Sequence, residues 1–192
     1  MKNEIKKKGV INNEKLIIRQ AVDADLEEIK SVVKSAFYCD GDNDEFNEWE
    51  FVDKVRCDKG FVKELSIVAV IDNKIVGYIL LSEAHIGNNK GLSLGPLGIE
   101  PKHKNMGIGK ELVKNGLEKA KELGYEWVAL TGGNYYLQFG FEPALKHNVI
   151  LSENNPENDY LKIIFLSKNN INQINGIMKF CDSFYNEKGE LL

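Results

Sequence analysis

The stretch that decides the fold is LGPLGIEPKHKNMGIGK, residues 94–110. A strand is predicted from about Leu92 to Ile99, and Pro101 ends it because proline lacks the backbone donor of a sheet ladder. A short loop then opens near Gly107 into a helix whose apolar residues follow helical spacing. The stretch therefore predicts a strand, a loop and a helix in direct succession.

The start of this helix is a candidate anion site. The first N–H groups of a helix have no intrahelical partner, and they lie at the positive end of the helix dipole. Gly107 and Gly109 would let a ligand approach the backbone without a Cβ in the way. Such a site suits a phosphate or pyrophosphate. The alternative is that both glycines only permit a tight turn, because short glycine motifs have a high false-positive rate.

Two established phosphate-binding motifs do not fit the spacing. A P-loop requires Ser or Thr after its Gly-Lys pair, whereas Gly109–Lys110 is followed by Glu111. A dinucleotide-binding fingerprint requires a small residue three positions after Gly109, and Leu112 stands there.

Helices and strands alternate along the rest of the chain. Asp72–Asn73, a dipeptide that tolerates positive φ, separates two β-rich runs and predicts a tight hairpin. The alternation predicts an α/β domain with a mixed sheet. Besides the strand before Gly107, strands are expected at 16–19, 65–71, 75–82, 127–131, from 141 and at 161–166, and helices at 23–37, 46–56, 107–123 and 135–139.

Composition excludes several classes of function. The formal net charge is −4, so the chain lacks the basic footprint of a nucleic-acid-binding protein. Cys39, Cys57 and Cys181 are far apart, and their odd number argues against a disulfide framework, which favours a cytoplasmic location. No apolar run approaches the roughly 20 residues of a membrane helix, and no metal site is expected.

Three segments are expected along the chain. The lysine-rich start is not followed by the apolar stretch of a signal peptide, so residues 1–15 are predicted to form a flexible tail. Residues 16–150 would form the main domain, and residues 151–192 a C-terminal extension packed on it.

Three motifs together resemble the GCN5-related N-acetyltransferases, the GNAT family. Lys104-x-x-Gly107-x-Gly109 is similar to the family's Arg/Gln-x-x-Gly-x-Gly/Ala signature, with lysine at the first position. The preceding Gly-Pro-Leu-x-Ile segment resembles its fourth strand, and residues 134–141, NYYLQFGF, resemble its closing motif. The match is closest to the YhbS-like predicted bacterial acetyltransferases, and it extends from about Ile17 to Phe184.

The resemblance implies a GNAT fold, with a mixed, splayed sheet flanked by helices and CoA lying in the splay. It also implies direct transfer of an acetyl group from acetyl-CoA to a primary amine in a ternary complex. Because lysine presents a compact charge and not a planar fork, the side-chain role of Lys104 is left open. The implied CoA-binding residues are Leu97 and Ile99 on the strand, Lys104, Asn105, Met106, Gly107, Ile108, Gly109 and Lys110 at the helix start, and Asn134.

The catalytic roles follow from the same resemblance. Tyr136, four residues before Gly140–Phe141, matches the family's general acid. A phenol with an unperturbed pKa near ~10 stays protonated at neutral pH, so it can supply a proton to a thiolate. Glu83 and His85, at the end of a strand, are candidate bases. Tyr135 is expected in the core, and Asn134 could equally form an Asx turn.

The residues of the acceptor site, the identity of the acceptor and some alternative functions stay open. Glu45, Glu48 and Trp49 could line the acceptor site or form a solvated helix face with one core tryptophan. The acceptor could be a small-molecule or peptide amine, and neither a nucleic acid nor a membrane is expected as a partner. A homodimer, a non-catalytic acyl-CoA sensor and a transferase for a longer acyl-CoA are the remaining alternatives.

Overall fold

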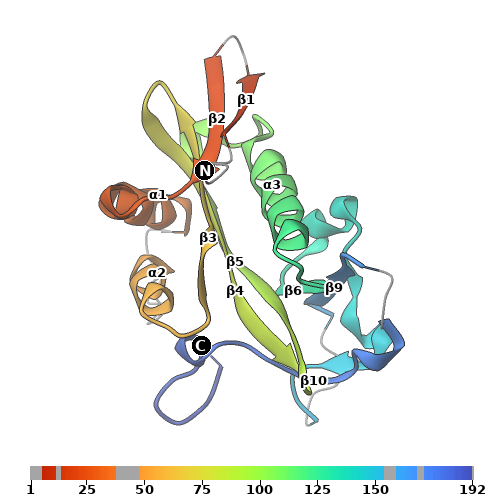
Figure 1. Cartoon of the computed structure of the whole chain (residues 1–192). Helices are drawn as coiled ribbons and strands as arrows, with labels where there is room; N and C mark the ends of the chain where they lie inside the picture. Colours follow the sequence, from red (N-terminus) through yellow and green to blue (C-terminus); the bar gives the residue numbers. More distant parts are fainter. Residues whose placement is uncertain (1–5, 12–13, 38–47, 154–158, 168–170, 192) are drawn as a thin grey trace.

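A mixed sheet runs the length of the molecule, with helices on both faces (Figure 1). The computed structural model describes residues 6–11, 14–37, 48–153, 159–167 and 171–191. The strands are β1 (Lys6–Ile11), β2 (Glu14–Gln20), β3 (Phe61–Ile71), β4 (Lys74–Ile86), β5 (Asn89–Ile99), β6 (Trp127–Thr131), β7 (Glu142–Pro143), β8 (Val149–Ile150), β9 (Leu161–Phe165) and β10 (Gly176–Lys179). The α-helices are α1 (Leu26–Phe37), α2 (Glu48–Arg56) and α3 (Ile108–Glu122). The 3₁₀ turns are η1 (Asp23–Asp25), η2 (Pro101–His103), η3 (Asn134–Phe139), η4 (Ala144–His147), η5 (Ile171–Gln173) and η6 (Asp182–Phe184).

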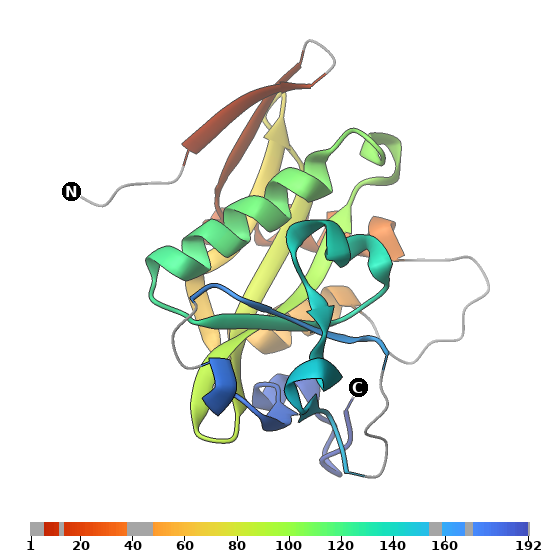
Figure 2. The ribbon, with the colours of Figure 1, turned by 90° about the vertical axis from the view of Figure 1, so that its right-hand side faces the viewer.

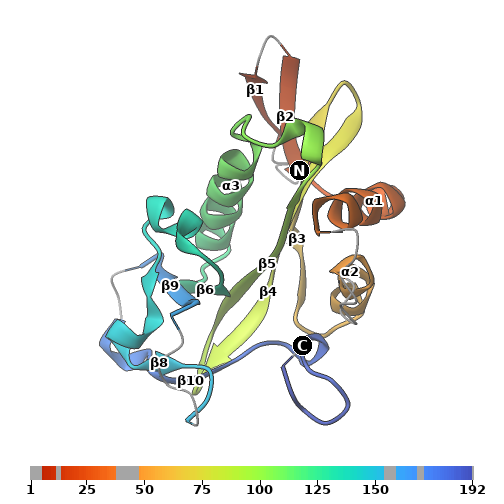
Figure 3. The ribbon, with the colours of Figure 1, turned by 180° about the vertical axis from the view of Figure 1, so that it is seen from behind.

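The strand order confirms the expected mixed sheet. Neighbouring strands follow the order β1-β2-β3-β4-β5-β6-β9-β7, and β10 pairs with both β4 and β8. The pairs β5–β6 and β8–β10 are parallel, whereas the others are antiparallel. Figures 1 and 3, from opposite sides, show α1 and α2 along one face of the sheet and α3 along the other.

The central strand β4 is buried on both faces, which explains its nearly continuous apolar sequence. Because successive side chains of a strand point to opposite faces, Tyr78 and Leu80 pack in the core beneath α1 and α2. Ile79 and Leu81 pack in the second core, beneath α3. The sheet is therefore fixed between two apolar layers.

Local sequence signals set the ends of these elements. Asp72 and Asn73, at φ of 48° and 64°, form the predicted turn between β3 and β4. Gly107 and Gly124 have φ of 81° and 87° and flank α3, where left-handed backbone favours glycine. The predicted tail over residues 1–15 is wrong in part, because β1 pairs with β2 from Lys6–Arg19 to Ile11–Glu14. A lysine-rich composition predicts exposure, but it does not prevent backbone pairing along a strand edge.

The absence of a side chain at Gly91 lets β5 lie directly against Trp127 of β6, the strand that follows α3. A Cβ at Gly91 would lie 2.1 Å from Cε2 of Trp127, the first residue of β6, whose side chain is fully buried. The indole ring therefore occupies the space that any larger residue at position 91 would need, and it fixes where β6 joins β5.

Substitution of Gly91 tests this contact. Gly91→Ala is expected to lower the free energy of unfolding by about 1–3 kcal/mol, because the ring or a strand must shift. Gly133→Ala is the matched control, since φ is −74° at Gly133 and a Cβ there meets nothing within 4 Å. Chemical denaturation should leave the control near wild type. Equal stability of the two variants would contradict the proposed packing constraint.

Candidate active site

Strands β5 and β6 separate soon after they meet. Their parallel pairing is confined to Leu92–Val128 and Ser93–Ala129, although β5 continues to Ile99. Next to this point the register of β5 against β4 shifts by one residue, between the pairs Leu81–Leu94 and Ile79–Leu97. The extra residue forms a β-bulge, a feature that bends a strand and increases its twist. The second half of β5 therefore presents an edge that β6 does not cover.

The backbone of Leu97 and Ile99 faces this open edge. The amide of Glu100 donates to the carbonyl of Val76 at 2.9 Å and so points toward β4. Because the backbone groups of successive strand residues point to opposite edges, those of Ile99 and Leu97 point away from β4. The two residues can thus pair with an extended ligand, as a further strand would.

The open edge leads to the start of α3. Gly107 is the N-cap residue of this helix, and no side chain caps the first turn. A Cβ at Gly107 would meet no atom within 4 Å, so the backbone there borders open space. The unpaired amides and the positive end of the dipole are therefore free to meet an anion, the arrangement on which the predicted site depends.

A groove of about 500 Å³ joins these features. Of the predicted CoA-binding residues, it brings together those on β5 and most of those at the helix start. It is lined by Leu97, Ile99, Lys104, Asn105, Gly107, Ile108, Gly109 and Lys110, and also by Ala36, Phe37, His103, Tyr135 and Gln138.

The groove carries positive charge at the helix start. Lys104 and Lys110 both line it, and within the described ranges neither forms a salt bridge with a carboxylate. His103 contributes an imidazole whose Nδ1 lies 3.0 Å from Oε2 of Glu100. Together with the helix dipole, the two lysines suit a ligand with several negative charges.

Tyr135 is a groove residue that the sequence places wrongly. It is expected in the core, but it is 45% exposed, and its hydroxyl oxygen lies 2.9 Å from the position of a Cβ on Gly109. Figure 2 shows η3 beside the start of α3. In a 3₁₀ turn residues i and i+3 eclipse, so Gln138 lies on the same side as Tyr135. The three-residue period of a 3₁₀ turn is the sequence signal that could have shown that Tyr135 and Tyr136 face different sides.

Tyr136 lies on the inner side of the same turn. Its ring makes edge contacts with the rings of Tyr135 and Phe141, at centroid distances of 5.2 and 5.8 Å. Burial raises the pKa of the Tyr136 phenol to about 12, so this group stays protonated at neutral pH. It can therefore donate a proton but cannot act as a base there.

A second cavity, of about 290 Å³, adjoins the groove. The two share Phe37, at the end of α1, and Leu97 on β5. Tyr136 lines the second cavity only, but its ring contacts that of Tyr135, a residue that lines the groove. The complete lining is Phe37, Phe51, Leu94, Gly95, Pro96, Leu97, Thr131, Tyr136, Phe180, Phe184 and Leu191.

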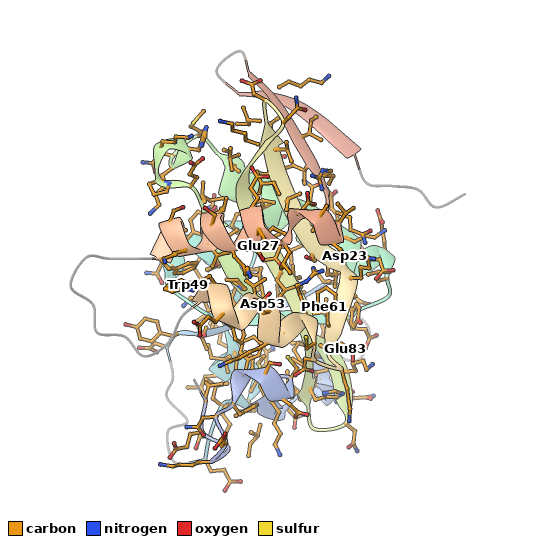
Figure 4. All side chains as sticks on the ribbon, turned by 90° about the vertical axis from the view of Figure 1, so that its left-hand side faces the viewer. Asp23, Glu27, Trp49, Asp53, Phe61 and Glu83 are labelled. Atoms are coloured by element: carbon orange, nitrogen blue, oxygen red, sulfur yellow. The ribbon has the colours of Figure 1, made fainter. Side chains whose placement is uncertain are left out.

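The candidate bases lie elsewhere. Glu83 accepts a hydrogen bond from the Tyr125 hydroxyl at 3.0 Å and pairs with Lys90 at 2.8 Å. His85 is exposed two residues further along β4, and neither residue lines the groove or the second cavity. Figure 4 shows Glu83 and Trp49 at opposite sides of the face that α1 and α2 cover. The prediction of a base at these positions is thus unsupported, because the far half of β4 runs away from the splay.

Other predicted residues also lie outside the two spaces. Asn134 is exposed at the first position of η3, and Met106 packs against the core beneath α3. Trp49 lies under Lys34, whose Nζ is 4.9 Å from the ring centroid, and packs against the core beneath α1 and α2. Glu45 and the side chain of Glu48 fall outside the described residues.

Metal-binding groups and membrane-spanning helices also bear on the nature of the site. Across the described ranges, no group of three or more His, Cys, Asp or Glu side chains is arranged to hold a metal ion. None of the helices in those ranges is long and apolar enough to cross a membrane.

Comparison with known proteins gives a consistent picture. The chain is 25% identical over 173 residues to the uncharacterized N-acetyltransferase YhbS of Escherichia coli K12, covering 88% of this chain and 98% of that protein. A crystal structure of YhbS from E. coli in complex with CoA superposes with a TM-score of 0.78, at 22% identity over 93% of this chain and 94% of that one. A GNAT family acetyltransferase from Brucella melitensis, solved with acetyl-CoA, has a TM-score of 0.71 and 26% identity, over 88% of this chain and 97% of that one.

The family model of the GNAT acetyltransferases matches residues 24–141. This match takes in β5, the loop, α3 and η3, the elements that form the groove and carry the three sequence motifs. Since the model matches more than half of the chain, the protein belongs to the GNAT family of acetyltransferases.

Proposed function

We propose that this protein transfers an acetyl group from acetyl-CoA to a primary amine by direct attack in a ternary complex. The observation that carries the proposal is the junction of two spaces at Leu97 and Phe37, with Tyr136 beside it. One space has the strand edge and the anion site that suit CoA, and the other has room for an acceptor.

The groove would hold acetyl-CoA largely through its backbone. The pantetheine arm would pair with the open edge at Leu97 and Ile99, and the pyrophosphate would lie on the amides of residues 105–110. Lys104 and Lys110 would add charge attraction from the rim of the groove. Backbone binding explains why lysine at position 104 is compatible with the site, because amides do not depend on side-chain identity. The relatives solved with CoA and acetyl-CoA support this ligand.

The reaction requires a neutral amine and a proton for the departing thiolate. Tyr136 is protonated, lines the second cavity and contacts Tyr135 of the groove, so it would supply that proton. The described lining of the second cavity has no carboxylate or imidazole. We therefore propose that the amine enters as its free base, with solvent taking up the proton it loses later.

The cofactor site is tested by a matched pair of glycine substitutions. Acetyl-CoA should raise the melting temperature of the wild-type protein, because a ligand that binds only the folded state stabilises it. Gly107→Glu should abolish this shift by placing a side chain and a negative charge in the anion site. Gly124→Glu carries a similar backbone penalty, at φ of 87° as against 81°, but lies at the opposite end of α3.

Thermal unfolding with and without acetyl-CoA checks both variants. Gly124→Glu should retain the ligand-induced shift even though its melting temperature without ligand falls. An undiminished shift in folded Gly107→Glu would place acetyl-CoA elsewhere on the molecule.

The general acid is tested by removing one hydroxyl. Tyr136→Phe keeps the ring but not the proton donor, so kcat and kcat/KM should fall together while acetyl-CoA affinity stays the same. The loss should be on the order of 10²-fold, the lower end for general acid catalysis, if water partly replaces the phenol. Tyr125→Phe is the control and should leave both quantities near wild type, since Tyr125 lines neither space and its hydroxyl donates to Glu83.

Steady-state kinetics and calorimetric titration of acetyl-CoA measure the two effects. Equal turnover of Tyr136→Phe and wild type would exclude the general-acid role. Binding of acetyl-CoA without thiol release for any amine would instead favour a non-catalytic acyl-CoA sensor.

A further inference from the structure

The C-terminal extension supplies one wall of the second cavity. Phe180, Phe184 and Leu191 line it together with Phe51 from α2. The Phe180 and Phe184 rings stack at 4.6 Å, and Phe51 meets Phe184 edge-on at the same centroid distance. This wall is therefore a contiguous aromatic surface, built from segments that lie far apart in sequence.

Hydrogen bonds to Asp58 hold this wall in place. One Asp58 oxygen accepts from both the amide and the hydroxyl of Ser183, each at 2.7 Å, and the other accepts from the amide of Gly60 at 2.7 Å. Burial raises the pKa of Asp58, but these hydrogen bonds outweigh it and leave the pKa below its usual value. Asp58 thus fixes η6, and with it Phe184, against the end of α2.

The chemistry of the lining restricts what can occupy the cavity. Its described residues carry no charged group, and their polar side chains are the hydroxyls of Tyr136 and Thr131. Among these described residues, a cation in addition to the reacting amine would lose hydration without meeting a partner carboxylate. A flat or branched apolar group would instead gain contact with the phenylalanine rings. The volume of about 290 Å³ lies at the lower limit of small-molecule sites, roughly 300–1,000 Å³, which indicates a small ligand.

We propose that the acceptor is a small primary amine with an aromatic or branched apolar substituent, not a polyamine or a lysine side chain. This inference rests on the proposed transferase function and specifies its substrate class. The substituent would lie against Phe180 and Phe184, with the amine at the junction near Leu97 and Tyr136.

The amine, the thioester, Tyr136 and solvent together account for every bond and proton of the transfer. The amine nitrogen attacks the thioester carbonyl, a C–N bond forms and the C–S bond breaks. The thiolate receives the phenol proton of Tyr136, the new amide loses one proton, and solvent restores the phenol. No oxidant, reductant or metal is needed for this balance.

An acceptor panel tests the substrate class, with thiol release measured under excess acetyl-CoA. 2-Phenylethylamine and 3-methylbutylamine represent the proposed class, whereas spermidine and Nα-acetyl-lysine represent cationic and lysine-like acceptors. The apolar amines should give kcat/KM values about tenfold higher or more, a typical discrimination by an apolar pocket. Equal or faster acetylation of spermidine would overturn this inference and leave the transferase function intact. Bound acetyl-CoA with no turnover of any amine would overturn the transferase function, and this inference with it.

Substitutions in the wall provide the second test. Phe184→Ala should lower kcat/KM for 2-phenylethylamine about tenfold, mainly through KM, and leave acetyl-CoA affinity unchanged. Phe165→Ala is the control, because its ring packs on His147 at 4.8 Å and lines neither space.

Leu191→Ser covers the case in which Phe184→Ala does not fold, because Leu191 is already exposed at the rim. It should raise KM for 2-phenylethylamine without affecting the melting temperature. Wild-type KM in every folded wall variant would show that the acceptor binds elsewhere.

Discussion

The separation of β5 from β6 after Ser93 is the constraint on which the rest of the site depends. A strand inside a sheet normally has both edges paired, and an unpaired edge exposes backbone donors and acceptors. Here the bulge in β5 and the short pairing with β6 leave Leu97 and Ile99 facing open space. Leu97 lines both the groove and the second cavity, so the same separation makes room for the two spaces.

The remaining fold keeps that opening rigid. β4 is buried between two apolar layers, so β5 is fixed along its other edge. At the closed end, Trp127 fills the space beside Gly91 and sets where β6 begins to pair. At the open end, η3 places Tyr135 against Gly109 and Tyr136 against Phe141, so that one tyrosine lines each space.

The local sequence predicted the backbone around the groove well. A strand, a proline, a loop and a glycine-flanked helix leave few alternatives for the backbone between residues 94 and 110, and the structure brings most of the named residues into one groove. The paired β3 and β4 were predicted for the same reason, since Asp72 and Asn73 specify a turn. β1 was missed because edge pairing depends on backbone groups that composition does not report.

Features made by distant segments could not be predicted in this way. Glu83 looked available for catalysis, but its partners are Tyr125, which follows α3, and Lys90, which lies across a hairpin. The aromatic wall joins Phe51 to Phe184 through a contact that only the docked C-terminal extension creates. Tyr135 and Tyr136 are adjacent in sequence, and the phase of a 3₁₀ turn decides which of them faces the groove.

The central claim is that the open edge of β5 and the start of α3 bind acetyl-CoA through backbone groups. Amide hydrogen exchange, followed with and without acetyl-CoA, tests it most directly because it reports on those groups. We expect new protection for the amides of Leu97 and Ile99 and for residues 107–110, and no change across residues 121–126 at the far end of α3. Unchanged exchange at Leu97 and Ile99 while acetyl-CoA is bound would contradict it.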